Sequence, residues 1–171
     1  MRKTAVTLLV PVLTAGAAHA GGIELTVEIP KLSVAEYHRP YVAIWLEDSK
    51  GQVAATLSIW YDIKLKDEEG EKWLKDIRQW WRRAGRALDL PADGVSSPTR
   101  PPGANKIEFK SDAGPLAKLA PGDYKLVVEA SREVGGKEMV EIPFKWAPGT
   151  EGTATASGKE ELGAVTLKLV K

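Results

Sequence analysis

The stretch YVAIWLEDSKGQVAATLSIWY, residues 41–61, contains two apolar runs separated by a short polar segment. The runs 41–48 and 52–61 are rich in β-branched and aromatic residues, which favour strands. Between them lies Asp48-Ser49-Lys50-Gly51, a combination typical of tight turns. The sequence therefore predicts a β-hairpin over this stretch.

The rest of the chain adds strand patterns on both sides of this hairpin. A second hairpin is predicted around Val134-Gly135-Gly136, and the Gly/Thr/Ala-rich stretch 148–158 is expected to be a loop. The strands predicted outside the first hairpin, from apolar alternation and composition, are 23–29, 106–109, 123–133, 137–146 and 163–170. With about seven strands, the sequence predicts an all-β fold, an immunoglobulin-like β-sandwich.

One segment departs from this pattern, GEKWLKDIRQWWRRAG at residues 70–85. Its apolar side chains recur at helical spacing, namely Trp73, Ile77, Trp80, Trp81 and Ala84. Acidic residues precede the segment and arginines crowd its end, in keeping with the helix dipole. We predict one inserted amphipathic helix near 70–85 that lies outside the sheets. Trp73 and Trp80 are expected in the core, whereas Trp81, beside two arginines, is expected to be partly exposed.

Residues 1–20 have the features of a signal peptide. A basic start is followed by an apolar run and by Ala18-His19-Ala20, which fits a signal-peptidase site. The apolar run is far shorter than the roughly 20 residues of a membrane span. We therefore expect cleavage after Ala20, no membrane insertion afterwards, and a single periplasmic or secreted domain over 21–171.

The composition of residues 21–171 excludes several classes of function. Residues 1–20 carry two of the 24 basic residues and none of the 23 acidic ones, so the mature chain has a formal net charge of −1. This balance argues against a nucleic-acid partner, which selects basic surfaces. Cysteine is absent, and His38 is the only histidine of the mature chain. No catalytic set and no metal-ligand spacing is present, so autonomous catalysis is not supported and metal or haem handling has only His38 in its favour.

Several segments of the sequence resemble one known family. The segments RPYVAIWLEDSKG, WLKDIRQWWR and YKLVVEASREVGGKEMVEIPF are similar to predicted periplasmic proteins known as domain of unknown function 2271. The resemblance runs from about residue 23 to residue 171. It implies an exported β-rich domain and gives no activity by itself.

The resemblance draws attention to the loop ADGVSSPTRPPG, residues 92–103. In many relatives this loop is similar to D-x-x-[ST]-G-A-T, the acceptor motif of FAD:protein FMN transferases. The resemblance implies that Thr99 accepts FMN as a phosphoester and that Asp93 fixes the loop. Ser96 takes the hydroxyl position of the motif, and we expect Arg100 to hold the phosphate.

The loop departs from that motif at two positions. Ser97 stands where glycine is usual, and Pro98 stands where alanine is usual; proline also restricts the residue before it to extended conformations. Two interpretations follow, a working acceptor or a solvated Ser/Pro/Gly loop in which Thr99 has no role.

Two functional hypotheses follow from these observations. In the first, the protein is a covalent FMN carrier in extracytoplasmic electron transfer, with an FMN transferase and a membrane reductase as partners. In the second, it is a non-catalytic binding or assembly module that uses the Trp81-Arg82-Arg83 surface of the helix.

Overall fold

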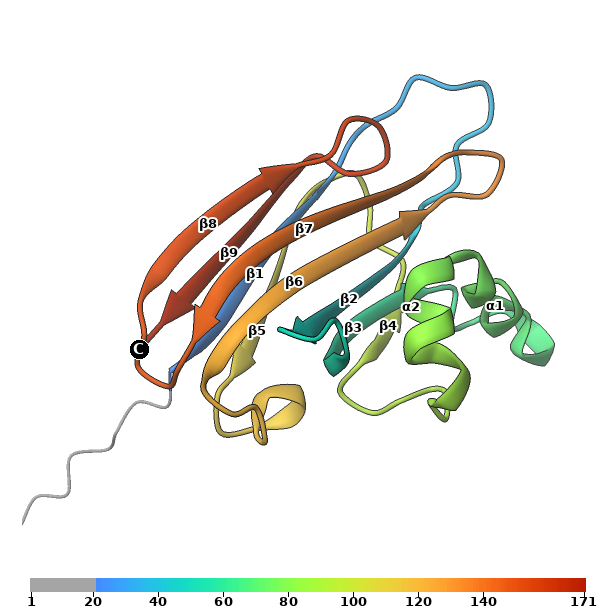
Figure 1. The fold of residues 1–171 in the computed structure, drawn as a ribbon. Helices are drawn as coiled ribbons and strands as arrows, with labels where there is room; N and C mark the ends of the chain where they lie inside the picture. Colours follow the sequence, from blue (N-terminus) through green and yellow to red (C-terminus); the bar gives the residue numbers. More distant parts are fainter. Residues whose placement is uncertain (1–20) are drawn as a thin grey trace, which may run out of the picture.

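The computed structural model describes residues 21–171, which form two β-sheets packed face to face (Figure 1). The predicted signal peptide, residues 1–20, lies outside the described residues. The four-stranded sheet has the order β5-β1-β9-β8, made of β1 (Gly22–Ile29), β5 (Gly103–Lys110), β8 (Gly152–Ser157) and β9 (Ala164–Val170). The five-stranded sheet has the order β4-β3-β2-β6-β7, made of β2 (Tyr41–Asp48), β3 (Val53–Tyr61), β4 (Ser96–Pro98), β6 (Gly122–Ser131) and β7 (Lys137–Trp146).

The predicted sandwich is confirmed, and its immunoglobulin-like assignment stays a prediction. Residues 21–171 contain nine strands rather than about seven, because β4 and β8 lie in stretches expected to be loops. In β8 the alternation is concealed by small residues: Ala154 and Ala156 pack toward the core, while Thr153 and Thr155, which alternate with them, face outward. Both additional strands are at sheet edges, where short, weakly apolar strands are common.

The main core lies between the two sheets. Alternate side chains of β1, β2, β6 and β9 meet there, including Leu25, Ile44, Val128 and Leu167, each 1 % exposed or less. Burial of an aliphatic side chain of this size stabilises the fold by about 1.5–3 kcal/mol. This core explains the period-2 pattern of the strands.

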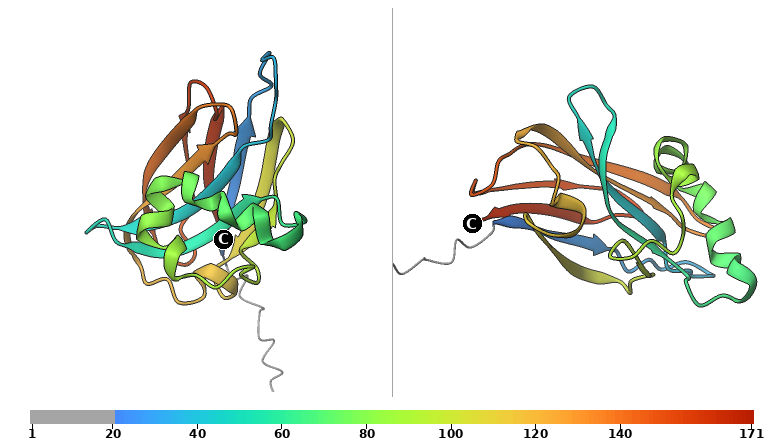
Figure 2. Two further views of the ribbon diagram at one scale, coloured as in Figure 1. Left: turned by 90° about the vertical axis from the view of Figure 1, so that its right-hand side faces the viewer. Right: turned by 90° about the horizontal axis from the view of Figure 1, so that it is seen from below.

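The five-stranded sheet is buried on its outer face as well. Along β2, Val42 and Ile44 pack between the sheets, whereas Ala43 and Trp45 face the opposite way, against the helical insertion. Covering both faces explains why this strand is apolar without interruption, as is usual for strands buried on two sides. The insertion lies over this outer face in Figures 1 and 2.

The insertion lies where one helix was predicted, but it is divided into short turns. It contains α1 (Glu69–Lys72), α2 (Arg78–Arg83) and the 3₁₀ turns Lys66–Glu68, Leu74–Asp76 and Gly85–Ala87. The division before α2 is at Ile77, whose φ of −78° and ψ of 77° lie outside the helical region. The backbone N–H groups at the start of α2 are thereby left without carbonyl partners within the segment.

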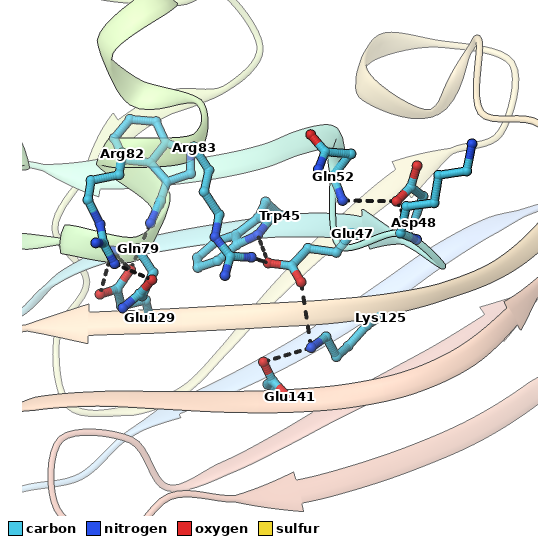
Figure 3. A network of polar contacts seen from close by, with 12 residues as sticks. Trp45, Glu47, Asp48, Gln52, Gln79, Arg82, Arg83, Lys125, Glu129 and Glu141 are labelled. Carbon is cyan, nitrogen blue, oxygen red and sulfur yellow. Dashed lines mark hydrogen bonds and ion pairs between the residues drawn. The ribbon is translucent and has the colours of Figure 1, made fainter.

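A carboxylate on β6 satisfies these groups. Glu129, 6 % exposed, accepts hydrogen bonds from the backbone N–H of Gln79 at 3.1 and 3.0 Å and from that of Trp80 at 3.0 Å (Figure 3). Negative charge at a helix N-terminus is stabilising, and a buried carboxylate needs such donors. The interaction therefore accounts for both the start of α2 and its attachment to the sheet.

The division of the helix changes which aromatic side chains are buried. Trp80 is fully buried, as predicted, and Trp81 is partly buried. The prediction for Trp73 is wrong, because this side chain is 48 % exposed. In the 3₁₀ turn, residues three apart share a face, so Leu74 and Ile77 face the sheet and Trp73 turns outward.

The role of Glu129 predicts a clear effect on stability. Glu129→Gln replaces one acceptor oxygen with a donor NH₂, so we expect the free energy of unfolding to fall by about 1–3 kcal/mol in a denaturant titration. Glu141→Gln on neighbouring β7 is the matched control, since its half-exposed pair with Lys125 contributes less than about 1 kcal/mol. Equal stability of the two variants would contradict the capping role.

Candidate functional site

A pocket of about 650 Å³ lies where four separate parts of the chain meet. This volume is within the roughly 300–1,000 Å³ usual for small-molecule sites. The first part is the β1–β2 connection with the start of β2, the second is the insertion, the third is the β6–β7 turn and the fourth is the loop after β4. The residues that line it are Tyr37, His38, Arg39, Tyr41, Asp62, Leu65, Trp73, Asp76, Thr99, Ser131, Arg132, Glu133, Val134 and Lys137.

The acceptor-like loop is anchored to the edge of the five-stranded sheet. Its strand β4 pairs in parallel with β3, and the Ser96 hydroxyl accepts a hydrogen bond from the N–H of Ala92 at 3.0 Å. Asp93 is exposed at the turn, and its carboxylate has no hydrogen bond within residues 21–171. The side-chain hydrogen bond within this loop therefore comes from Ser96, and the role of Asp93 stays a prediction.

The structure separates the other predicted residues of the loop. Thr99, partly buried, lines the pocket. Arg100 does not, because its guanidinium lies over the Trp60 ring, 5.5 Å from the ring centroid. Ser97 Oγ is buried, with no hydrogen-bond partner in the described chain. Thr99 and Arg100 therefore do not line the same pocket, although we expected both to contact one phosphate.

The β6–β7 turn contributes a buried arginine to the pocket. The Arg132 side chain is 7 % exposed, and its Nε and Nη2 donate to the Glu161 carboxylate at 2.9 and 3.0 Å. The hydrogen bond with Glu161 raises the pKa of Arg132 above its ordinary value. Arg132 Nη1 is also buried, but it has no partner among residues 21–171. The arginine is thus fixed in place while one donor stays free.

A tyrosine hydroxyl beside Arg132 is also buried and unpaired within residues 21–171. Tyr37 Oη is buried and has no hydrogen-bond partner in the described part of the chain. Burial raises the pKa of Tyr37 above its ordinary value, with Arg132 opposing the shift, so the phenol is neutral at physiological pH. Buried polar groups in native proteins are nearly always satisfied, so these two atoms, on residues that line one pocket, are unusual.

The charges that line the pocket are mostly paired. Lys137 lies 3.4 Å from Asp76, and the imidazole of His38 lies 3.4 Å from Glu133. His38 also contacts Glu36 at 2.8 Å. Residues 21–171 hold no group of three His, Cys, Asp or Glu side chains arranged to bind a metal ion.

A second hollow, of about 630 Å³, lies on the outer side of the insertion. We call it the basic surface, and its lining residues are Lys75, Asp76, Arg78, Gln79, Trp81, Arg82 and Arg86. Within residues 21–171, none of its four cations belongs to an ion pair. Of the predicted Trp81-Arg82-Arg83 surface, only Trp81 and Arg82 line this hollow, and Arg83 points elsewhere.

Arg83 joins a buried network centred on Glu47 (Figure 3). The Glu47 carboxylate, 4 % exposed, bonds Arg83 and accepts from Trp45 Nε1 at 3.0 Å, with Lys125 Nζ at 3.5 Å. The turn that follows β2 is closed by Asp48, whose carboxylate accepts hydrogen bonds from the backbone N–H groups of Lys50 and Gln52. Neither role could be recognised from the strand alone, because Arg83 lies 36 residues from Glu47 and Gln79 lies 50 residues from Glu129.

Fold and site together define a β-sandwich domain with a ligand-sized pocket beside a helical insertion. The chain belongs to the family described as "Predicted periplasmic protein (DUF2271)", whose model matches residues 22–164. This agrees with the expected family and with the expected periplasmic location. Comparison with curated proteins and with solved structures gave no match. No helix within residues 21–171 is long and apolar enough to cross a bilayer.

The contacts of the loop that carries Glu161 make the stability of the protein depend on pH. Burial pushes the pKa of Glu138 upward, but hydrogen bonds from the backbone N–H groups of residues 159–162 outweigh it, so the pKa lies below its ordinary value of 4.5. A lowered folded-state pKa stabilises the protein above the unfolded-state pKa, and this contribution is lost as the pH falls through the folded-state pKa.

We therefore expect Glu138→Gln to lower the free energy of unfolding at pH 7, with the difference from wild type shrinking below about pH 4.5. Denaturant titrations of both proteins between pH 3 and pH 7 measure this difference. A difference that stays constant over the range would contradict the assignment.

Proposed function

We propose that this protein is an extracytoplasmic carrier of FMN attached covalently to Thr99. The observation that carries the proposal is the position of Thr99, directly after an edge strand and on the wall of the pocket. An edge strand can be reached by a modifying enzyme from its unpaired side. The pocket beside it has the size of a cofactor site.

The attachment is performed by a transferase, with FAD as the donor. The Thr99 hydroxyl oxygen forms a bond to the flavin-side phosphorus of FAD, the pyrophosphate P–O bond breaks, AMP leaves and the hydroxyl proton is released. The product is a phosphoester, heavier than the unmodified chain by one FMN less one water. The attached flavin supplies redox chemistry that the side chains of this domain lack.

The two departures from the usual motif agree with the local backbone. Ser97 and Pro98 both lie in β4, which is extended and pairs with Trp60 and Tyr61 of β3. A proline in an edge strand keeps its fixed φ without costing a needed N–H bond. The substitution therefore suits a transferase that grips the acceptor segment in an extended form.

In this proposal the chain is a carrier rather than an enzyme. A membrane reductase delivers electrons to the flavin and a periplasmic acceptor removes them. Among the pocket residues, Arg39 is exposed and has no acidic partner within the described residues, so it is the cation available to the phosphoester. This replaces the role expected of Arg100.

Intact mass and visible absorbance test the proposal directly. Coexpressed with an FMN transferase, the mature protein should be yellow and carry one FMN less one water, and Thr99→Ala should be colourless and unmodified. Ser97→Ala is the matched control, since it removes a neighbouring hydroxyl that has no partner and should leave modification intact. An unmodified wild type, in cells where the transferase labels another acceptor protein, would contradict the proposal.

A second candidate function, a non-catalytic binding module, is favoured by the basic surface. Its four cations surround the partly buried Trp81 and lack acidic partners within residues 21–171. Such a patch attracts an acidic protein surface and raises the rate of association at low salt. Both functions can reside in one chain, because the two hollows share only Asp76 among their lining residues.

Charge reversal tests this second function. Arg78→Glu with Arg82→Glu should abolish recovery of an acidic partner from periplasmic extract at low salt, while the protein stays folded. Lys106→Glu with Lys110→Glu on β5, in the other sheet, is the control for net charge and should leave recovery unchanged. Equal recovery by both pairs, or recovery insensitive to salt, would exclude the basic surface as the contact.

A further inference from the structure

The chemistry of the pocket indicates more than the place where a cofactor is attached. Its charged side chains largely cancel: Lys137 faces Asp76, and Arg132 is bonded through two nitrogens to Glu161. Glu133 lies beside the His38 imidazole, and the two lining charges without an ion pair in residues 21–171, Arg39 and Asp62, are of opposite sign. A small free anion would gain little from cations that already have partners nearby. The interior of the pocket therefore favours a ligand part without net charge.

The two unpartnered atoms specify what that ligand part must offer. Arg132 Nη1 can only donate a hydrogen bond, and Tyr37 Oη, a neutral phenol, can donate one as well. Both residues line the pocket. A ligand that satisfies both atoms must bring an acceptor oxygen or nitrogen to each of them.

The apolar part of the pocket provides a surface for a planar ring. Trp73 is 48 % exposed, although a side chain of its size is usually buried. Lys75 Nζ lies over this indole, 5.6 Å from the ring centroid, which leaves the opposite face for another group. Leu65 and Val134, 40 % and 73 % exposed, also line the pocket. Three of the six exposed large apolar side chains of residues 21–171 therefore line this one hollow.

We propose that the pocket binds a neutral, planar heteroaromatic ring with acceptor atoms along one edge, with Trp73 as the stacking surface and Arg132 and Tyr37 as donors to that edge. The inference rests on the proposed function in taking the flavin ring, with its two carbonyl oxygens on one edge, as the natural occupant. It makes Tyr37 and Trp73 specificity-determining residues for the ring, distinct from the attachment residue Thr99.

Because the ring is attached at Thr99, the pocket needs only a weak affinity for it. Attachment through a short linker gives the ring an effective concentration in the millimolar range. The pocket therefore holds the attached ring if its affinity for the free ring has a Kd of about 1 mM or tighter. Such an affinity can be measured on a protein that carries no covalent flavin.

Riboflavin, which lacks the phosphate, is the probe. Calorimetric titration of the mature Thr99→Ala protein with riboflavin should show saturable binding with a Kd at or below about 1 mM. Trp73→Ala should weaken binding about tenfold, as expected for loss of a stacking partner. Tyr37→Phe, which removes one hydroxyl and keeps the ring, should weaken it by about twofold to tenfold. Met139→Ala, an exposed apolar side chain outside the pocket, should bind like the parent.

The outcomes separate this inference from the proposed function. Riboflavin binding that is lost in Trp73→Ala supports the ring site even if the wild type is never flavinylated. No riboflavin binding up to millimolar concentration, or equal binding by the Trp73→Ala and parent proteins, overturns the ring site even if Thr99 carries FMN. Competition by inorganic phosphate, or binding of FMN without binding of riboflavin, would show that the pocket recognises an anion instead.

Discussion

The five-stranded sheet holds two buried carboxylates that bond the insertion, Glu47 and Glu129, and the arrangement of the insertion depends on how the charge of Glu129 is satisfied. Its hydrogen-bond donors are the backbone N–H groups of Gln79 and Trp80, and the chain leaves the helical region at Ile77. Burying a charge is costly unless it is hydrogen-bonded, which makes this geometry stringent. Trp73 faces outward, toward the pocket, because the helix before Ile77 is interrupted.

The same principle recurs on the far side of the pocket. Glu138 binds the backbone of residues 159–162, and this loop holds Glu161 against Arg132. Two carboxylates and one arginine thereby fix the β6–β7 turn without disulfides or metal ions in the described chain. Two of the four segments that bound the pocket, the insertion and the β6–β7 turn, are thus held by buried charge, and walls fixed in this way are suited to holding a ligand in one orientation.

The sequence was sufficient for the elements that depend on local patterns and insufficient for those that depend on distant partners. The hairpin at 41–61, the sandwich and the exported character follow from alternation, turn residues and the first twenty residues. The break at Ile77 could not be predicted, because its cause is a carboxylate 50 residues away. Thr99 was named from a motif, and the structure places it on a pocket wall, yet Tyr37, Trp73 and Arg132 carry no local signal for the same site. Arg100 follows Thr99 in the chain but lies over Trp60, a separation that no spacing argument reveals.

In the proposed carrier, the attachment point on an edge strand lies at a pocket that suits a neutral planar ring. A basic surface suited to an acidic partner lies next to this pocket. A crystal structure of the mature protein coexpressed with an FMN transferase tests it most directly. The account predicts continuous density from Thr99 Oγ to a flavin ring stacked on Trp73, with its carbonyl edge toward Arg132 Nη1 and Tyr37 Oη. Continuous density that leads the ring into solvent, or a Thr99 that carries no flavin, would contradict it.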